Sequence, residues 1–577
     1  MLTLGEAFRL LFPDASRQIL GFVEAPVLPA DIFAFAAYVL EASGAYHHVT
    51  PESGAPSPDR QIIVDGKMRA RAIRVGKSWR ESTVPPGKLP SVPARITKLW
   101  RGLQPFSSEL AFTNLAPDAV CPSWWPIMVE LLMISDEASR HVGFVADNIF
   151  YAPVVEAFTE GDVISGREFR RIQSGPATIS TADPSIVCVQ PKSRTPAVGC
   201  TMRSLSHHLA LLPGQGSVRA SWVTSPFEAD GAAPQNLGLL LIPYPYAVDA
   251  SVFVAAGDAR NRWGWFGVEQ QWLPAIGDSE GRKAFVIFVL DLVRAARKGE
   301  RRVDGVVLPE LSLDLPLFRQ LARALAEESG VDFLISGISS DRHGREGNFV
   351  AIAPFFLTGE GKLTGGLDQL FLIREKHHRW KLTEPQIKDY QIEAALPPSR
   401  SWWEHLNLLG RGLDLLVYRG GTSLTTLICE DLARVDPCQA VLRAVGPNLV
   451  VALLMDGPQL EGRWPARYAT VLAEDPGSSV LTFTSLGLIE RQNQAKKYPQ
   501  SSAIGLWKDE AHGVQRLELP RSSDAVHLVL KADTKTEHTL DGRSDDANAH
   551  RWVFEGYEGI SADPLAKPKW LSTGKAR

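Results

Sequence analysis

Cysteine is scarce in this chain, and long apolar stretches are absent from it. Only five cysteines occur among 577 residues, at positions 121, 188, 200, 429 and 438. An odd number of widely spaced cysteines does not predict a disulfide framework, so each is treated as a thiol. The apolar run 285–290, like every other apolar run in the sequence, is far shorter than the roughly 18 residues that a membrane span needs. The sequence therefore predicts no membrane span.

The sequence also lacks a large excess of positive or of negative residues. Lys and Arg number 61 against 65 Asp and Glu, and hydrophobic residues make up 45% of the chain. This composition is typical of a globular protein and excludes a disordered or fibrous one. The first residues lack the basic start and the small-residue cleavage site of an export signal. We therefore expect a cytoplasmic protein.

Composition divides the chain into three predicted parts. Segment 225–236 collects Pro, Gly, Ala and Asn between two apolar segments, which indicates a boundary or an exposed loop. We predict an α+β domain of unknown role over residues 1–235, an α/β domain over 236–533 and a polar C-terminal tail over 534–577.

The α/β prediction rests on strands and helices that alternate along the chain. Apolar runs at 304–311, 331–339 and 448–455 predict strands, whereas helical spacing of apolar residues predicts helices over 282–299 and 317–330. Interleaved strands and helices are typical of a layered α/β domain.

Residues 60–101 form a basic stretch, with eleven basic residues against two acidic ones. The Asp65-Gly66 pair between alternating segments predicts a β-hairpin, in which Lys67, Arg69 and Arg71 lie on one face. Such a face attracts phosphates, as in a nucleic acid. It is also typical of a plain solvated strand surface, and no nucleic-acid-binding motif accompanies it.

Three residues of complementary chemistry lie near the carboxyl ends of three predicted strands: Glu310 in DGVVLPE, Lys376 after LDQLFLIRE and Cys429 in TTLIC. Open α/β sheets place their sites at this edge. Burial there would raise the pKa of Glu310 toward that of a general base, and backbone N–H groups of a following helix would favour the thiolate of Cys429. Taken singly, each has a structural alternative: a helix-entry carboxylate, a surface lysine and a buried small hydrophobe.

The order Glu, Lys, Cys in LPEL, REKHHRWKLTE and LICEDL resembles the nitrilase, or carbon-nitrogen hydrolase, superfamily over about residues 236–532. The resemblance implies an α-β-β-α sandwich, in which Glu310 is the general base, Lys376 the family's lysine and Cys429 the nucleophile. Lys381 is an alternative to Lys376, although only Lys376 directly continues the strand.

The resemblance also implies residues that support the site. Glu384, eight residues after Lys376, stands where many members keep a second, structural glutamate, and His378 completes a K-x-H context. The backbone N–H of Glu430 would help to hold an oxyanion. The stretch SRSWWEHLNLLGRG indicates an insertion beside the pocket, and Ser485 stands where relatives often have Asn.

The sequence thus predicts a hydrolase that cleaves a non-peptide carbon-nitrogen bond of a small molecule through a Cys thioester. LICEDL is most similar to the glutaminase portion of glutamine-dependent NAD synthetases, which favours amides or glutamine-type substrates over nitriles, but no SGGxDS-type ATP loop is present. The chemistry needs no metal or organic cofactor, and adjacent histidine pairs seldom chelate one ion. The alternatives are acyl transfer to an amine and a non-catalytic binding or regulatory scaffold. Family members often dimerise, so the resemblance implies a homo-oligomer.

Overall fold

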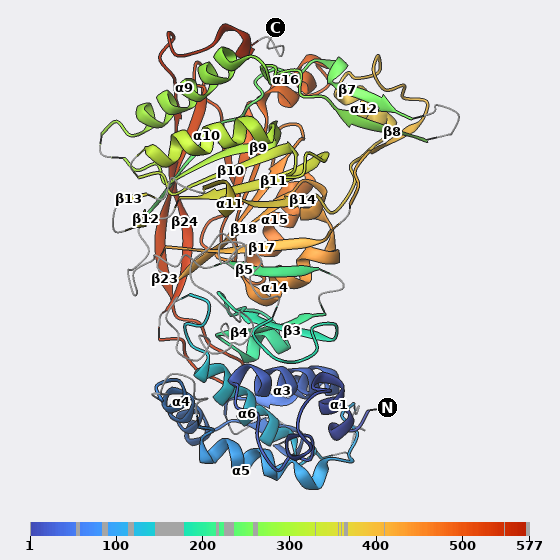
Figure 1. Ribbon diagram of the computed structural model, residues 1–577, viewed down its shortest axis with the longest axis vertical. Helices are drawn as coiled ribbons and strands as arrows, with labels where there is room; N and C mark the ends of the chain where they lie inside the picture. The colour runs from blue at the N-terminus through green and yellow to red at the C-terminus, as the bar shows by residue number, and fades with distance from the viewer. Residues whose placement is uncertain are drawn as a thin grey trace.

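The protein is described here from a computed structural model that covers residues 2–52, 58–82, 91–112, 120–144, 178–214, 218–223, 236–257, 263–299, 301–328, 330–355, 357–358, 361–362, 367–408, 410–419, 421–546 and 548–572. Except for Asn236, the predicted boundary segment 225–236 lies outside these residues. The molecule is elongated, with a layered α/β part at one end and a helical N-terminal part at the other (Figure 1).

Two seven-stranded sheets form the centre of the α/β part. The first has the order β14-β11-β10-β9-β6-β23-β24, with β6 Leu237–Leu241, β9 Gly305–Leu313, β10 Phe333–Ser340, β11 Glu346–Pro354, β14 Leu372–Glu375, β23 Ala525–Lys535 and β24 Ala549–Ile560. The second has the order β22-β21-β20-β19-β18-β17-β5, with β5 Arg219–Val223, β17 Gly412–Tyr418, β18 Thr422–Ile428, β19 Leu449–Leu454, β20 Ser479–Thr484, β21 Ala503–Lys508 and β22 Gln515–Glu518.

The two sheets pack face to face, and helices cover their outer faces (Figure 1). Every residue of β6, β9, β18, β19 and β20 is buried, because one face of each strand meets the other sheet and the opposite face meets helices. The first sheet is covered by α9 (Ser279–Ala296) and α10 (Leu315–Glu327), and the second by α14 (Ala440–Val445) and α15 (Trp464–Glu474). This arrangement is an α-β-β-α sandwich.

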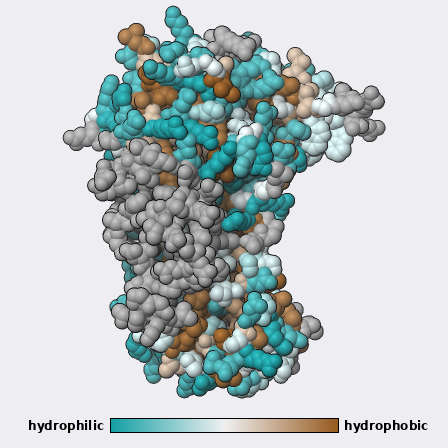
Figure 2. All heavy atoms as spheres, viewed as in Figure 1, coloured by the Kyte–Doolittle hydropathy of each residue, from teal (hydrophilic) through white to brown (hydrophobic). Residues whose placement is uncertain are grey.

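The covering helices show why the sequence pattern was informative. Asp314 caps α10 by accepting a hydrogen bond from the backbone N–H of Leu317 at 2.8 Å. Leu317, Leu321 and Leu325 recur at helical spacing and are fully buried against the first sheet. Hydrophilic side chains predominate on the outer side of the molecule over α9 and α10 (Figure 2).

Shorter elements surround the sandwich. A four-stranded sheet projects from one end (Figure 1) and has the order β15-β16-β8-β7, with β7 Phe253–Ala256, β8 Trp263–Val268, β15 Lys381–Leu382 and β16 Ser401–Glu404. The remaining elements are the β-pair β12 Leu357–Thr358 and β13 Gly361–Lys362 and the helices α11 Leu367–Leu370, α12 Glu384–Asp389, α13 Glu430–Ala433 and α16 Leu486–Gln494.

The N-terminal part has its own apolar core. Its helices are α1 Leu4–Leu11, α2 Arg17–Leu20, α3 Pro29–Ser43, α4 Gly66–Arg80, α5 Ala94–Gly102 and α6 Trp125–Ala138, and its two-stranded sheets pair β1 Val49–Thr50 with β2 Ile62–Ile63 and β3 Val187–Pro191 with β4 Leu209–Pro213. Within the described parts of the chain, no helix has both the length and the apolar character to cross a bilayer.

The β-hairpin expected around Asp65-Gly66 is wrong. Asp65 instead caps α4, because its carboxylate accepts a hydrogen bond from the backbone N–H of Met68 at 2.7 Å. Lys67, Arg69 and Arg71 therefore do not share one face of a strand, since residues two apart on a helix point in different directions.

Part of the basic stretch is used inside the protein. Arg71 and Arg95 both pair with the carboxylate of Glu130. Arg80 donates to the carbonyl of Glu137 at 2.6 Å and Arg101 to that of Val23 at 3.0 Å. Lys88 lies outside the described residues. These contacts supply a structural reason for several of the cations.

Two of the predicted domain limits need correction. Residues of β5, assigned to the first domain, pair in parallel with β17 and form an edge of the second sheet. Residues 534–577, expected to be a polar tail, contain β24, which pairs with β23 along Ala549–Ile560. The α/β part thus takes strands from both sides of the predicted 236–533 span.

Candidate active site

Glu310, Lys376 and Cys429 come from three different strands, and the ammonium of Lys376 contacts the carboxylate of Glu310. Glu310 lies near the end of β9, Lys376 directly follows β14, and Cys429 directly follows β18. All three are buried, with exposed fractions of 3%, 0% and 3%. The charges of both Glu310 and Lys376 act on the Cys429 thiol.

The Lys376 ammonium lies between two carboxylates. Its Nζ donates to Glu310 Oε1 and to Glu404 Oε2, both at 2.8 Å. Glu404 ends β16 and is 4% exposed. A buried cation with two hydrogen-bonded carboxylates is fixed in position, because every alternative leaves a buried charge uncompensated.

Asn348, in β11, completes this network. Its Nδ2 donates to Glu310 Oε1 at 2.7 Å and to Glu404 Oε1 at 2.8 Å, and its backbone carbonyl accepts from the backbone N–H of Lys376 at 2.8 Å. Glu310 Oε2 is buried and has no hydrogen-bond partner among the described residues. One oxygen of Glu310 is therefore held and the other is available to a reacting group.

Cys429 has a backbone conformation that few non-glycine residues adopt, with φ 43° and ψ −106°. Such strain persists only where the surroundings fix it, and it concentrates at functional sites. Here the backbone N–H of Cys429 donates to Leu453 of the neighbouring strand at 2.8 Å, and α13 begins at the next residue. The sharp turn between β18 and α13 places the thiol at the sheet edge.

Burial controls the protonation of the site. It raises the pKa of the Cys429 thiol well above its ordinary value; the charge of Glu310 adds to this and that of Lys376 opposes it. Burial also raises the pKa of Glu310. Burial alone would lower the pKa of Lys376, but the carboxylates of Glu310 and Glu404 raise it well above its ordinary value. The resting site therefore contains a charged ammonium and a protonated thiol.

Asp431, the second residue of α13, ties the Cys429 turn to the segment after β14. Its Oδ1 accepts from the backbone N–H groups of His377 at 3.0 Å and His378 at 3.1 Å, and its Oδ2 accepts from Arg374 at 3.2 Å. These bonds hold the residues on both sides of Lys376 and thereby set its position. The sequence motif LICEDL contained Asp431, but only the fold shows its partner.

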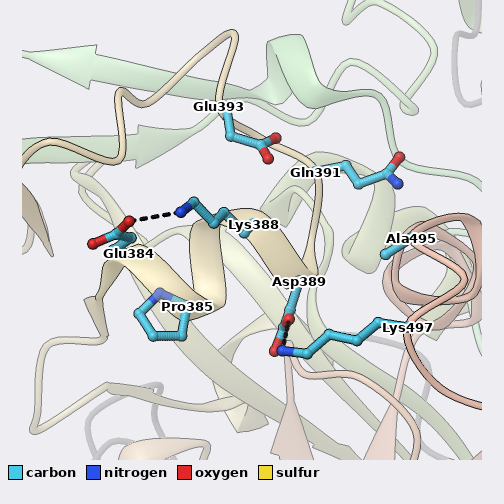
Figure 3. Close-up of a pocket in the computed structure, with 8 residues that line it drawn as sticks. All are labelled: Glu384, Pro385, Lys388, Asp389, Gln391, Glu393, Ala495 and Lys497. Carbon is cyan, nitrogen blue, oxygen red and sulfur yellow. Dashed lines mark hydrogen bonds and ion pairs between the residues drawn. The ribbon is translucent and has the colours of Figure 1, made fainter.

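Glu384, which the resemblance assigned as the second glutamate, lies elsewhere. It is the first residue of α12, its side chain is 59% exposed, and it pairs with Lys388 at 2.6 Å. Figure 3 shows both residues on the wall of a surface pocket. Because α12 directs Glu384 into solvent, it does not contact Lys376.

The second glutamate that contacts Lys376 in the structure is Glu404. It lies in the SRSWWEHLNLLGRG stretch, which sequence reasoning treated as an insertion. The signal that was available is the short segment SWWE, in which Trp402 and Glu404 alternate with partly exposed residues and are buried.

The remaining residues that the resemblance connected with the site lie around the Cys429 turn or outside the buried cluster. His378 Nδ1 lies 3.2 Å from Asp431 Oδ1, and the Glu430 side chain pairs with Arg434 at 2.6 Å. Lys381 is exposed and its ammonium lies over the Trp403 ring at 5.1 Å, so it is not the lysine beside Glu310. Ser485 is buried directly before α16.

A cleft of about 1060 Å³ reaches Asn348 and Glu404 from the surface. A second pocket, of about 640 Å³, is the one beside Glu384 and is remote from the buried cluster. In the described ranges, no three His, Cys, Asp or Glu side chains are grouped as a metal site would need.

No protein-family model matches the chain, and no curated protein matches it. Solved structures do match. A glutamine-dependent NAD+ synthetase from Acinetobacter baumannii is 12% identical with a TM-score of 0.30, and the match covers 56% of this chain and 48% of that one. An amidase from Nesterenkonia sp. is 13% identical with a TM-score of 0.27, over 50% of this chain and 92% of that one.

A member of branch 10 of the nitrilase superfamily from Saccharomyces cerevisiae is 11% identical with a TM-score of 0.28, over 50% of this chain and 89% of that one. This chain spans about half the length of the synthetase. The solved structures that the chain matches thus include this member of the nitrilase superfamily and a CN-hydrolase superfamily protein from Xanthomonas campestris, which is 11% identical with a TM-score of 0.26 over 57% of this chain and 92% of that one.

Proposed function

We propose that this protein is a hydrolase that cleaves a carbon-nitrogen bond of a small amide, with Cys429 as the nucleophile. The observation that carries the proposal is the buried Glu310–Lys376–Glu404 network, in which the charges of Glu310 and Lys376 act on a thiol at a strained strand end. A lysine with a purely structural role could form its ion pair on the surface at little cost in free energy. The burial of Lys376 near a thiol is better explained by a catalytic role.

The acylation half of the reaction begins with a proton transfer. Because the Cys429 thiol is protonated at rest, it needs a base, and the free Oε2 of Glu310 is the atom suited to take its proton. The sulfur then attacks the carbonyl carbon. The Lys376 ammonium and the backbone N–H of Glu430 hold the oxyanion, an effect worth about 3 to 4 kcal/mol for one donor. The carbon-nitrogen bond breaks, and Glu310 returns the proton to the departing amine.

The deacylation half uses the same residues. Water loses a proton to Glu310 and its oxygen attacks the thioester carbon, so the carbon-sulfur bond breaks. The carboxylic acid leaves and the proton returns to the Cys429 sulfur. An amine in place of water would make the same enzyme an acyl transferase. The cleft beside Asn348 and Glu404 is a suitable path for the substrate. The reaction requires no metal or organic cofactor.

The test is ammonia release from a panel of primary amides. Wild-type protein is expected to hydrolyse at least one amide, and Cys429→Ala and Glu310→Gln are each expected to lower kcat by about 100-fold or more. Cys121→Ala is the matched control, because Cys121 lies in the N-terminal part, and its activity should equal that of wild type. Full turnover by both Cys429→Ala and Glu310→Gln would contradict the proposal.

A further inference from the structure

Asp456 lies at the same sheet edge as Cys429, and the catalytic steps above do not use it. It follows β19 by two residues, and β19 pairs in parallel with β18, which leads to Cys429. The backbone hydrogen bond from Cys429 to Leu453 fixes the register of the two strand ends. Parallel strands deliver the residues after their carboxyl ends to one edge.

The two carboxylate oxygens of Asp456 have different surroundings. Oδ1 accepts from the Tyr390 hydroxyl at 2.6 Å, from Arg463 Nη2 at 2.7 Å and from the backbone N–H of Gly457 at 2.8 Å. Oδ2 is buried and has no partner among the described residues, although Asp456 as a whole is only 6% exposed. A buried carboxylate oxygen without a donor is costly, so an orphaned one indicates a place for a ligand donor.

Arg463 does not supply the missing donor. Its other terminal nitrogen, Nη1, donates to the carbonyl of Pro458 at 3.1 Å and to Gln492 Oε1 at 3.3 Å. Three bonds fix Asp456 through Oδ1, so Oδ2 has a defined position. Its negative charge acts on the Cys429 thiol, which places it within electrostatic range of the reacting sulfur.

We propose that Asp456 Oδ2 binds a protonated primary amino group in the acyl part of the substrate, so that the enzyme prefers amides that carry an ammonium group near the scissile carbonyl. This inference rests on the proposed function, because it names the substrate class of the same site. Three carboxylates, those of Glu310, Glu430 and Asp456, and one cation, that of Lys376, act on the thiol. A cationic substrate offsets this excess, whereas an anionic one adds to it.

The test compares three amides of similar length: 4-aminobutanamide, which is cationic, pentanamide, which is neutral, and succinamic acid, which is anionic. For wild-type protein, kcat/KM for the cationic amide is expected to exceed that for the neutral one by roughly 10-fold to 100-fold, the usual effect of one charge-assisted hydrogen bond. Succinamic acid should be the poorest substrate. Equal kcat/KM values for the three amides would overturn the inference and leave the proposed function intact.

Asp456→Asn tests the residue itself. The amide keeps an oxygen for Tyr390 and Arg463 but presents an NH2 group where Oδ2 was, so the ratio of cationic to neutral kcat/KM should fall toward 1. Asp436→Asn is the matched control, because its side chain is 72% exposed and pairs with Arg411, and it should keep the wild-type ratio. An unchanged ratio in a folded Asp456→Asn protein would overturn the assignment.

Binding to Cys429→Ala protein separates recognition from turnover. Asp456 is intact in this variant, so calorimetry should find 4-aminobutanamide bound at least about 10-fold more tightly than pentanamide. This measurement also decides the matter if Asp456→Asn does not fold. Equal affinities would overturn the inference. Preferential binding without hydrolysis by wild-type protein would contradict the proposed function and uphold the amino-group site.

Discussion

At the scale of single residues, the site depends on the protonation states of three groups that are all out of water. Lys376 stays charged because Glu310 and Glu404 flank it, and the Cys429 thiol stays protonated because burial disfavours its thiolate. In the proposed reaction Glu310 therefore removes the proton of the Cys429 thiol. The pKa of Glu310 is itself raised by burial. A carboxylate with a raised pKa takes the proton of a thiol at a smaller cost in free energy than a carboxylate with an ordinary pKa does.

The pH dependence of activity follows from these directions. Glu310 must be ionised to accept the thiol proton, so kcat/KM should fall as the pH drops through the raised pKa of Glu310, above its ordinary value of 4.5. Because the pKa of Lys376 is raised well above 10.5, loss of its charge should not lower activity below pH about 10. A pH profile of kcat/KM measures both limbs. An acid limb at or below pH about 4 would contradict this account.

Glu404 should act by positioning Lys376 and by raising the pKa of Glu310. We expect Glu404→Gln to lower kcat/KM by about 10-fold to 100-fold, because one of the two bonds to the ammonium is weakened. It should also move the acid limb of the pH profile to lower pH, because the charge of Glu404 raises the pKa of Glu310. A purely structural role would leave that limb in place.

Glu384→Gln is the control for this experiment. The Glu384 carboxylate is exposed and pairs only with Lys388 in the described structure, so the variant should keep both wild-type activity and the wild-type pH profile. Loss of activity in Glu384→Gln together with normal activity in Glu404→Gln would reverse the two assignments.

At the scale of secondary-structure elements, the close approach of β9 and β10 sets the position of Glu310. A Cβ atom at Gly337 of β10 would lie 2.4 Å from the backbone nitrogen of Leu311, 2.5 Å from Glu310 Cα and 2.6 Å from the carbonyl oxygen of Pro309. All three are backbone atoms, so no side-chain rotation relieves the overlap. Leu311 itself has a positive φ of 54°, so the backbone of β9 departs from a regular strand directly after Glu310.

Gly337→Ala should therefore move β9 and the base that it carries. We expect a loss of about 1 to 3 kcal/mol in the free energy of unfolding and, in the folded protein, a fall in kcat of about 100-fold. Gly556→Ala in β24 is the control, because a Cβ there meets nothing within 4 Å. Denaturant titration and ammonia release measure the two effects. Wild-type values for Gly337→Ala would contradict the proposed constraint.

The elements that could be predicted from the sequence are those buried on both sides. The apolar runs of β9, β10 and β19 and the leucine repeat of α10 have no alternative that buries them equally well. Two edge strands, β5 and β24, were missed. Charged residues such as Arg551 and Glu558 are interspersed with the buried residues of β24, so its sequence resembles a polar tail. β5 directly precedes the poorly patterned boundary segment 225–236.

The candidate site was predictable in part for a related reason. Glu310, Lys376 and Cys429 each lie near or directly after the end of an apolar strand, so the local sequence marks them. Glu404 belongs to a short strand far from Lys376 in sequence, and Asp456 precedes a glycine in a loop. Their roles depend on which strands become neighbours, and single-sequence patterns do not specify that.

At the scale of the whole molecule, the N-terminal part is joined to the α/β part by buried ion pairs. The Arg543 guanidinium is fully buried and donates to Asp136 at 3.0 Å and Glu137 at 2.9 Å, both in α6, as well as to Asp541 at 3.0 Å. Residues after β23 thus reach back into the N-terminal core before the chain returns as β24. Arg203 pairs with Asp475 at 2.7 Å across the same junction.

Replacing Arg543 should uncouple these parts. Arg543→Met leaves the carboxylates of Asp136 and Asp541 buried without their cation, and we expect a loss of about 3 to 5 kcal/mol in stability. Denaturant titration combined with limited proteolysis should show the junction opening first. Arg551→Met, which removes a partly exposed pair with Asp533, should cost no more than about 1 kcal/mol. Equal stability of the two variants would contradict the role given to Arg543.

The most direct test of the central claim is to trap the acyl-enzyme. Wild-type protein is incubated with an amide that it hydrolyses, quenched in acid during turnover and digested for mass spectrometry. The account predicts that the peptide containing Cys429 gains the mass of the acyl group, that hydroxylamine removes it, and that Cys429→Ala shows neither adduct nor ammonia release. Steady ammonia release by Cys429→Ala, or an adduct on another residue in its place, would contradict the account.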